Sequence, residues 1–386
     1  MESGAALLLT GRAIQLLNSF GWSVVLLKRF GLSMMGTFAV GVVAVTVLST
    51  VSPLGLPSFL PRVRQPHARL CFAGITLHLA LLPIIVSMLL VYAKLFAQTP
   101  EEVPIVFLVA LSGFVIGSSN TGLMLSIMVE RFYPAAVAPL FETVAIFAAA
   151  FSIASPKTVA AYMLLSRLAG ALLVWSGMQI SPMSLRRLTF VFRRSIGYLA
   201  PDAIATLSEQ IAPFILQMVT TRAELGLFRL CQQMLNASDT PGWSYVQSMY
   251  PRLVRSNQLF FVSVERTVTR LAMVASVLCA SCSAILVIWV YHLPVILPMM
   301  CLLSASLFWR YKNNLYDQGF RASGRVTTAT ALGAMKLFCA GVLFYFLIKW
   351  QGVWGAVVAL TALSIVAGVG YEWVYARPTI LARVPS

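Results

Sequence analysis

The sequence predicts an all-α membrane protein of about twelve transmembrane helices, and three observations carry this prediction. Apolar residue types make up 59% of the 386 residues, whereas soluble domains average roughly 45–50%. Charged types make up only 10%, against about 25% in soluble domains. Apolar stretches long enough to span a bilayer, about 20 residues each, follow one another along the whole chain. A water-soluble fold of this length would need more charge to cover its surface, so the composition excludes one.

Hydropathy places the predicted spans with short loops between them. The first is a span and not a cleavable signal peptide, because its apolar segment is too long and no small-residue cleavage site follows it. The eighth is the least apolar, because Gln232, Gln233, Asn236 and Asp239 interrupt it. The predicted spans are 5–27, 33–58, 69–94, 104–129, 134–154, 157–180, 197–219, 225–249, 267–290, 293–310, 327–348 and 352–375.

The distribution of Lys and Arg predicts that both termini are cytoplasmic. One set of loops holds 18 of these residues and the opposite set holds 6, and cytoplasmic loops carry the excess. The smaller set is Lys28, Arg29, Lys94, Lys157, Arg222 and Lys349. The larger set is Arg62, Arg64, Arg69, Arg131, Arg186, Arg187, Arg193, Arg194, Arg252, Arg255, Arg266, Arg270, Arg310, Lys312, Arg321, Arg325, Arg377 and Arg383. The net charge of +16 therefore reflects membrane edges, and a nucleic-acid partner is not expected.

An internal repeat predicts two lobes of six helices each. Shifting the chain by 190 residues places Gly36 on Gly226 and Phe38 on Phe228. The same shift places Ser58, Pro61 and Arg62 on Ser248, Pro251 and Arg252. The basic segment 181–196 is the expected linker, so the lobes are 1–185 and 186–386. Six spans per lobe give a parallel repeat, with the substrate site expected between the lobes.

Two motifs resemble the O-antigen and exopolysaccharide lipid flippases of the multidrug/oligosaccharidyl-lipid/polysaccharide exporter superfamily. One is Arg-Phe-Gly at 29–31, followed by Gly-Leu-Pro-Ser-Phe-Leu-Pro-Arg at 55–62. The other is the segment 225–255, LGLFRLCQQMLNASDTPGWSYVQSMYPRLVR. The resemblance implies a V-shaped, MATE-like fold that works by alternating access. Twelve spans favour this branch over the fourteen-helix branch that carries peptidoglycan precursors.

The resemblance also implies the cargo and the setting. The cargo is an undecaprenyl-pyrophosphate-linked oligosaccharide repeat unit, moved across the bacterial inner membrane for surface polysaccharide biosynthesis. Membrane lipids surround the protein, and a polysaccharide polymerase and glycosyltransferases are the further partners expected. No cofactor is expected. The sugar, the coupling ion and the oligomeric state stay open.

Eight ionisable residues lie inside predicted spans and away from the span ends, where a charge is costly and usually faces a cavity or a partner. Arg12, Arg229 and Lys336 are the candidate ligands of a pyrophosphate, because Arg offers a fork and Lys a point charge to phosphate oxygens. Snorkelling to an interface is their alternative role. The other five are Glu142, Arg167, Asp202, Glu209 and Asp239.

The polar residues of the eighth span, of which Gln232 and Asn236 are candidate sugar ligands, form one stripe at helical spacing. The stripe lines either a cavity or a helix–helix contact. Asp239 and Glu209 are the candidate ion-coupling carboxylates. Glu142 and Arg167 are predicted to form a structural ion pair.

Arg12 and Asp202 correspond under the 190-residue shift, and we expect them to form a cytoplasmic gate. The alternative is that Asp202 only caps the start of its helix.

Two other functions compete with the flippase. A cation-coupled multidrug antiporter of the same fold needs a more acidic cavity, but acids and bases inside spans are equally frequent here. A membrane-embedded polysaccharide-processing enzyme needs a large outer loop or a cluster of catalytic groups. The longest outer loop, 95–103, is short, and the three histidines are scattered, so no enzyme and no metal site is predicted. The six cysteines lie in or beside apolar segments and are expected to be buried structural residues.

Overall fold

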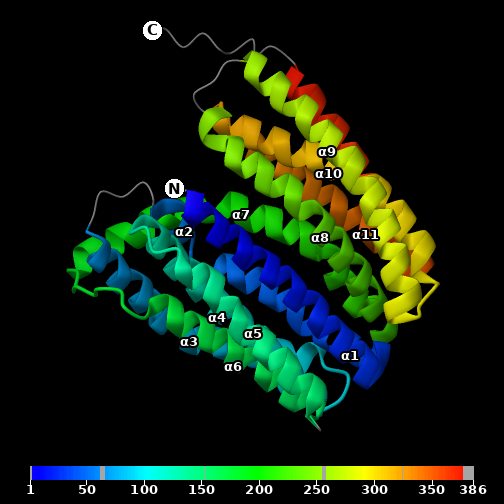
Figure 1. The fold of residues 1–386 in the computed structure, drawn as a ribbon, viewed down its shortest axis with the longest axis horizontal. Coiled ribbons are helices and arrows are strands. Elements are labelled where there is room, and N and C mark those ends of the chain that lie inside the picture. Colours follow the sequence, from blue (N-terminus) through cyan, green and yellow to red (C-terminus); the bar gives the residue numbers. More distant parts are fainter. Residues whose placement is uncertain (1, 61–65, 153, 254–257, 324, 377–386) are drawn as a thin grey trace. The chain divides into compact units, whose positions relative to one another are not determined.

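The computed structural model describes residues 2–60, 66–152, 154–253, 258–323 and 325–376, and its regular elements there are all helical (Figure 1). This agrees with the predicted all-α fold class. The helices are α1 (Glu2–Val51), α2 (Leu56–Phe59), α3 (His67–Phe96), α4 (Glu102–Met128), α5 (Tyr133–Phe151), α6 (Pro156–Trp175), α7 (Leu185–Val219), α8 (Arg222–Leu253), α9 (Gln258–Ile285) with the π-helical turn η2 (Leu286–Tyr291), α10 (Ile296–Ala322) and α11 (Val326–Ala376).

Two glycines divide the longest helices between predicted spans. Gly31 interrupts α1 with φ 78°, and Gly352 interrupts α11 with φ 57°. Positive φ values favour glycine because it has no Cβ. At about 1.5 Å per residue, α1 and α11 are each about twice as long as a bilayer core of about 30 Å is thick. Each therefore has the length for two predicted spans.

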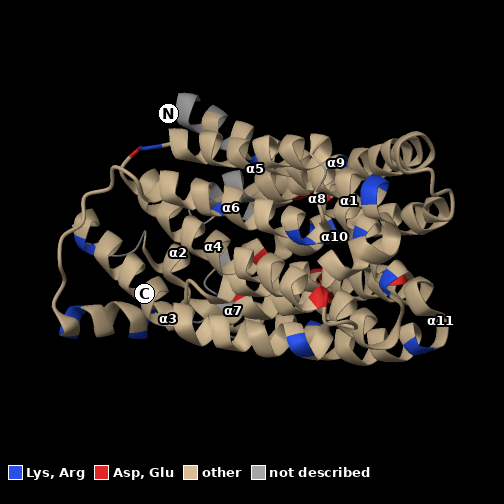
Figure 2. Cartoon of the chain, turned by 90° about the horizontal axis from the view of Figure 1, so that it is seen from below, with Lys and Arg blue, Asp and Glu red and all other residues tan. Residues whose placement is uncertain are grey.

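Seven helical segments among the described residues are long and apolar enough to cross a membrane: those in α1, α3, α4, α5, α6, α9 with η2, and α11. The helices α7, α8 and α10 carry more polar residues, although a predicted span falls on each of them. Lys, Arg, Asp and Glu occupy few positions along the helices, most of which are coloured tan for other residue types (Figure 2). The protein is thus a multi-pass helical membrane protein, and its count of twelve spans stays a prediction.

Two features of the sequence-based topology are wrong. The segment 181–196 is not a loop throughout, because α7 begins at Leu185. The tenth predicted span ended at 310, but α10 continues to Ala322. Arg310 and Lys312 therefore lie within a helix and not in a cytoplasmic loop.

Several residues used in the motif and the charge count lie outside the described residues: Pro61, Arg62, Arg64, Arg255, Arg377 and Arg383.

The chain divides into two compact units, Met1–Arg229 and Leu230–Ser386, with the boundary inside α8. In the first unit α4 packs against α1, α3 and α6, and α7 packs against α1 and α2. In the second unit α10 packs against both α9 and α11. The predicted lobes, 1–185 and 186–386, are defined by the repeat and not by compactness, and their boundary stays a prediction.

Within the first unit, α1 and the start of α8 approach each other through a pair of glycines. A Cβ placed on Gly36 would lie 1.8 Å from the carbonyl oxygen of Arg222. A Cβ placed on Gly226 would lie 2.5 Å from the carbonyl oxygen of Leu32 and 3.1 Å from the nitrogen of Gly36. Real Cβ atoms do not approach backbone this closely, so only glycine fits at either position without a backbone shift.

This glycine contact is reciprocal under the 190-residue repeat. The shift places Gly36 on Gly226 and Leu32 on Arg222. Gly36 faces the carbonyl of Arg222, and Gly226 faces the carbonyl of Leu32, so the shift converts one contact into the other. A contact that maps onto itself in this way is the signature of a two-fold relation between the contacting parts. The contact therefore agrees with the predicted parallel repeat at this one point, and the repeat itself stays a prediction.

Replacing either glycine of this contact by alanine is expected to destabilise the protein. The added methyl meets backbone, and overpacking of this kind costs roughly 1–3 kcal/mol. Gly197 in α7 is the matched control, because a Cβ there meets nothing within 4 Å. Alanine at a helical glycine with free space stabilises by roughly 0.5–1 kcal/mol. Thermal unfolding of the purified variants in detergent measures the difference.

The expected result is a lower Tm for Gly36→Ala and Gly226→Ala and an unchanged or higher Tm for Gly197→Ala. Equal behaviour of all three variants would contradict the close approach.

Candidate functional site

A buried ion pair lies beside the glycine contact. The Nη2 of Arg222 is 3.2 Å from Oε2 of Glu102 at the start of α4, and it also donates to the carbonyl oxygen of Phe96. The side chains of Arg222 and Glu102 are only 4% and 13% exposed. Glu102 also accepts hydrogen bonds from Thr37 Oγ1 at 2.9 Å and from the Gln98 backbone N–H at 2.9 Å.

These bonds tie α1, the α3–α4 connection and the start of α8 together at one point. Removing one partner of a buried ion pair typically costs about 3–5 kcal/mol, because the other charge stays desolvated. The sequence analysis placed Arg222 in a loop and did not single out Glu102. Nothing in the linear pattern marks their pairing, because 120 residues separate them.

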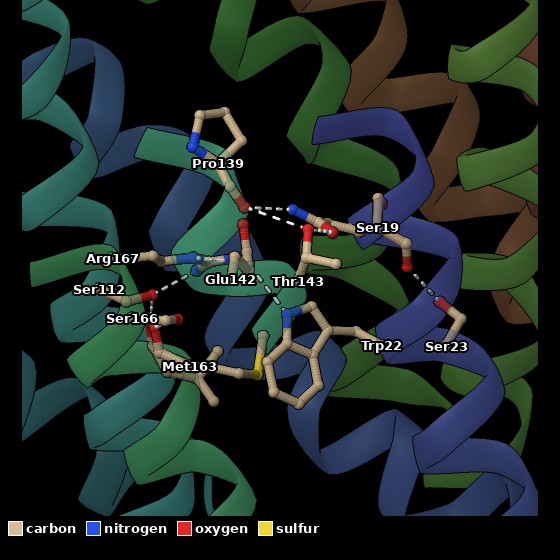
Figure 3. Close-up of polar contacts among 12 residues, drawn as sticks. Ser19, Trp22, Ser23, Ser112, Pro139, Glu142, Thr143, Met163, Ser166 and Arg167 are labelled. Carbon is tan, nitrogen blue, oxygen red and sulfur yellow. Dashed lines mark hydrogen bonds and ion pairs between the residues drawn. The ribbon is translucent and has the colours of Figure 1, made fainter. Parts of the chain in front are cut away.

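A second polar network lies among α1, α4, α5 and α6 (Figure 3). The Oε1 atom of Glu142 accepts from Arg167 Nε at 3.2 Å and Nη2 at 3.0 Å, and from Trp22 Nε1 at 2.9 Å. Arg167 Nη1 donates to Ser112 Oγ. The predicted structural ion pair is confirmed, and its charges balance each other.

A neighbouring set of hydrogen bonds joins Asn18 of α1 to Pro139 and Thr143 of α5, which Figure 3 labels. Asn18 Nδ2 donates to the carbonyl oxygen of Pro139 at 2.8 Å, and Thr143 Oγ1 donates to Asn18 Oδ1 at 2.8 Å. Thr143 Oγ1 also lies 3.4 Å from the same carbonyl oxygen of Pro139, so this carbonyl has two side-chain donors. The network stabilises the helices of the first unit by satisfying polar groups that lipid cannot.

The second unit contains an ion pair between α8 and α10. Arg310 donates from Nε and Nη2 to Asp239 Oδ2, at 3.3 and 3.2 Å, and from Nη2 to Asn236 Oδ1 at 3.2 Å. Asn314 Nδ2 donates to the other carboxylate oxygen of Asp239 at 3.4 Å. The Arg310 and Asp239 side chains are about equally buried, at 15% and 14% exposed.

For Asn236 and Asp239, the structure shows the helix–helix contact that was the alternative to a cavity lining. Gln232, one turn earlier, is buried. Roles of Gln232 and Asn236 in binding substrate stay predictions. Arg310 was missed because its charge was assigned to a loop, although the polar positions Arg310, Asn313 and Asn314 at helical spacing were a usable signal.

A further cluster links α9, α10 and α11 in the second unit. Lys312 Nζ of α10 lies 3.0 Å from Glu372 Oε2 and 3.9 Å from Glu265 Oε1, and Tyr316 Oη donates to Glu265 at 2.6 Å. Two carboxylates share one ammonium group, so the cluster holds one excess negative charge. Sequence analysis did not single out these residues.

The remaining predicted residues lie on four helices. Arg12 is exposed on α1, Glu209 is exposed on α7, and Arg229 and Lys336 are partly buried on α8 and α11. Asp202 accepts a hydrogen bond from Ser58 Oγ of α2 at 3.0 Å. Its predicted alternative role as a helix cap is wrong, because α7 begins at Leu185 and Asp202 lies well inside it. The Arg12–Asp202 gate stays a prediction.

Metal ligation has no support in the part of the chain that the structure describes. No group of three or more His, Cys, Asp or Glu side chains there is placed to hold a metal ion. Cys71, Cys231 and Cys279 are buried, and Cys282, Cys301 and Cys339 are exposed, in contrast to the expectation that all six are buried. An apolar thiol facing lipid costs little, which is why hydropathy did not distinguish the two groups.

Comparison with known structures identifies the fold. The chain is similar to the lipid II flippase MurJ in its inward closed conformation, with a TM-score of 0.78 over 97% of this chain and 87% of that one, at 9% identity. It has the fold shared by MurJ and the MATE transporters. An outward-facing multidrug resistance MATE transporter of the MOP superfamily matches with a TM-score of 0.63 over 95% and 92% of the two chains, at 15% identity.

A third match is a MOP superfamily transporter from Pyrococcus furiosus whose binding pocket is described as having reverse polarity. Its TM-score is 0.65 over 95% and 93% of the two chains, at 15% identity. No protein-family model and no curated protein sequence matches the chain. The predicted preference for the polysaccharide branch over the peptidoglycan-precursor branch receives no support, because the likeness to MurJ is as extensive as the likeness to the MATE proteins.

The Asp239–Arg310 pair is expected to stabilise the second unit. Asp239→Asn and Arg310→Gln should each lower the free energy of unfolding by roughly 3 kcal/mol, because each leaves a poorly solvated charge. The double variant should lose less than the sum, with a coupling of about 0.5–3 kcal/mol. Unfolding in detergent of the two single variants and the double variant measures this coupling.

Arg310→Gln combined with Glu142→Gln is the control, because Arg310 and Glu142 share no partner. Their effects should add. A coupling as small for Asp239 with Arg310 as for this control would show that the pair contributes nothing.

Proposed function

We propose that this chain is a flippase that moves a polyprenyl-pyrophosphate-linked oligosaccharide across the bacterial inner membrane for surface polysaccharide biosynthesis. The observation that carries the proposal is the fold shared with a lipid II flippase over 97% of the chain. The name of that protein, lipid II flippase, gives its cargo as a lipid-linked molecule. The sequence resemblance to polysaccharide flippases also implies a lipid-linked cargo. The exporter motifs at 29–31 and 225–255 favour an oligosaccharide repeat unit as the cargo.

The proposed substrate ligands match the two ends of such a cargo. Arg12, Arg229 and Lys336 supply cations that replace the water around a pyrophosphate as it leaves the aqueous phase. Gln232 and Asn236 offer amide donors and acceptors of the kind that bind sugar hydroxyls. Glu142 and Asp239 are paired with other cations, Arg167 and Arg310.

Alternating access requires one end of the molecule to close while the other opens. In the predicted topology the glycine contact and the Glu102–Arg222 pair lie on the outer side. Together they form what we term the outer contact, defined by Gly36, Gly226, Glu102 and Arg222. We assign it the closure of the outer side while cargo enters from the cytoplasm. The Arg12–Asp202 gate is its proposed counterpart on the cytoplasmic side.

Ion coupling is assigned to Glu209 and Asp239. Protonation of Asp239 would leave the charge of Arg310 unbalanced, so a proton at this site would weaken the contact between α8 and α10. This links a protonation step to a structural change within the second unit.

The second candidate is a cation-coupled multidrug antiporter, which the likeness to MATE transporters supports. A cationic drug needs a carboxylate whose charge is not already balanced. The pairing of Glu142 with Arg167 and of Asp239 with Arg310 removes two such carboxylates, which makes this candidate the weaker one.

Reconstituted vesicles test both functions. Purified protein should translocate a fluorescent polyprenyl-pyrophosphate oligosaccharide and should not accumulate ethidium against a pH or Na⁺ gradient. Arg12→Ala, Arg229→Ala and Lys336→Ala should each slow translocation at least about tenfold, since a hydrogen bond to a charged group contributes about 1.5–3 kcal/mol. Lys157→Ala, which removes an exposed lysine at the start of α6, is the control.

Normal lipid translocation by all three alanine variants would refute the assigned ligands. Drug transport without lipid translocation by the wild-type protein would replace the flippase with the antiporter.

A further inference from the structure

The first third of α7 carries a cluster of arginines on one side. Arg186 and Arg193 are seven residues apart, as are Arg187 and Arg194, so each pair lies on the same side of the helix and about 10.5 Å apart along it. All four side chains are exposed. Phe190 is exposed between the two pairs, and the guanidinium of Arg194 lies 5.5 Å from the centre of its ring. We call these five residues the basic face.

The opposite side of this segment is fixed in the apolar core of the first unit. Leu188 and Val191 are buried against a cluster that includes Leu56, Leu60 and Leu70. Ser195, one turn after Val191, is also fully buried. Because the buried side anchors the helix, the helix backbone itself holds the basic face toward the outside of the first unit.

In the part of the chain that the structure describes, no ion pair joins an arginine of the basic face to an acidic residue. No Asp or Glu occurs between Glu142 and Asp202 in the sequence. The first turn of α7 also contains no acidic residue. Arg186 and Arg187 thus stand at the positive end of the helix dipole, where cations are unfavourable and an anion is stabilising.

Exposed apolar side chains flank the basic face. Leu185 is 79% exposed and Ile196 is 50% exposed, and both lie on the same flank of the helix, because eleven residues are close to three full turns. The apolar predicted span 197–219 follows directly in the same helix. A helix that has a basic side and an exposed apolar flank, next to a span, has the pattern of a segment lying in the headgroup region of a bilayer.

We propose that the basic face binds the phosphate groups of anionic phospholipids at the membrane surface. Arginine suits this ligand, because its fork matches two phosphate oxygens. A membrane lipid also suits the exposed apolar side chains Phe190, Leu185 and Ile196, because they can insert at the boundary between headgroups and acyl chains. A soluble phosphorylated partner would leave these side chains in water. Bound lipid phosphates would neutralise four unpaired charges on the segment that joins the two repeats. The proposal does not depend on the nature of the cargo.

The test uses full-length protein purified in a neutral detergent and titrated with phosphatidylglycerol or with phosphatidylcholine, with the thermal unfolding midpoint as readout. Phosphatidylglycerol should raise the Tm in a saturable way, and phosphatidylcholine should not. Each arginine near an anionic surface contributes about fivefold to affinity. The variant Arg186→Gln/Arg187→Gln/Arg193→Gln/Arg194→Gln should therefore need at least about tenfold more phosphatidylglycerol for the half-maximal shift.

The matched control replaces four exposed lysines, Lys28, Lys94, Lys157 and Lys349, by Gln, which removes the same charge. It should change the half-maximal concentration by less than about twofold, a margin smaller than the effect of one surface charge. The double variant Arg187→Gln/Arg194→Gln should give an intermediate loss, so that the test survives if the quadruple variant folds poorly.

Two outcomes would overturn the proposal. Equal losses in the arginine and lysine variants would show diffuse attraction and no site. Unchanged phosphatidylglycerol binding by the arginine variant, with weaker binding of a polyprenyl pyrophosphate, would assign the basic face to the cargo and not to membrane phospholipid.

Discussion

The close approach of Gly36 to Arg222 and of Gly226 to Leu32 is the constraint on which the rest of the first unit depends. Two helices touch here through bare backbone, and any side chain at either glycine would separate them. The contact maps onto itself under the 190-residue shift, as the predicted parallel repeat requires. It also brings the start of α8 close enough to α4 for Arg222 to reach Glu102. A glycine contact alone is easily separated, and the buried ion pair gives it a definite closed state.

Several charges inside this protein are balanced by a neighbouring charge of opposite sign. Glu142 and Arg167 satisfy each other in the first unit, as do Asp239 and Arg310 in the second. Lipid offers no hydrogen bonds, so an unbalanced charge inside a span would be costly and would mark a functional position. The Glu265–Lys312–Glu372 cluster holds one excess negative charge, but it lies at the ends of predicted spans, and Glu372 is 42% exposed. The basic face of α7 holds an excess of the opposite sign, and we propose that lipid phosphates balance it.

Much of the helical architecture could be predicted from hydropathy, and the failures have identifiable causes. Apolar length located the helices, because a span needs continuous apolar surface. Hydropathy ended the tenth predicted span at Arg310, because a charge at the end of an apolar stretch is usually taken as a boundary. The partner of Arg310, Asp239 on α8, could not be seen in the linear sequence. Hydropathy also assigned 181–196 to a loop, because arginines without acids look like a loop even when Leu188 and Val191 hold them in a helix.

The candidate site was less accessible from sequence than the fold. The pairing of Glu142 with Arg167 was predictable because the two residues lie on adjacent spans. The pairing of Glu102 with Arg222 was not, since both residues were assigned to short loops where charges are common. Only the repeat hinted at this region, because it matched Gly36 with Gly226.

We propose that the outer contact closes one side of a transporter and must open in every cycle. The most direct test places cysteines at Glu102 and Arg222, after removal of the six native cysteines, and links them with a short, reducible bifunctional thiol reagent. Lipid-linked oligosaccharide translocation in vesicles is then measured before linking, after linking and after reduction. Linking should stop translocation and reduction should restore it, relative to the same protein treated with a monofunctional reagent. Translocation at an undiminished rate by fully linked protein would contradict the account.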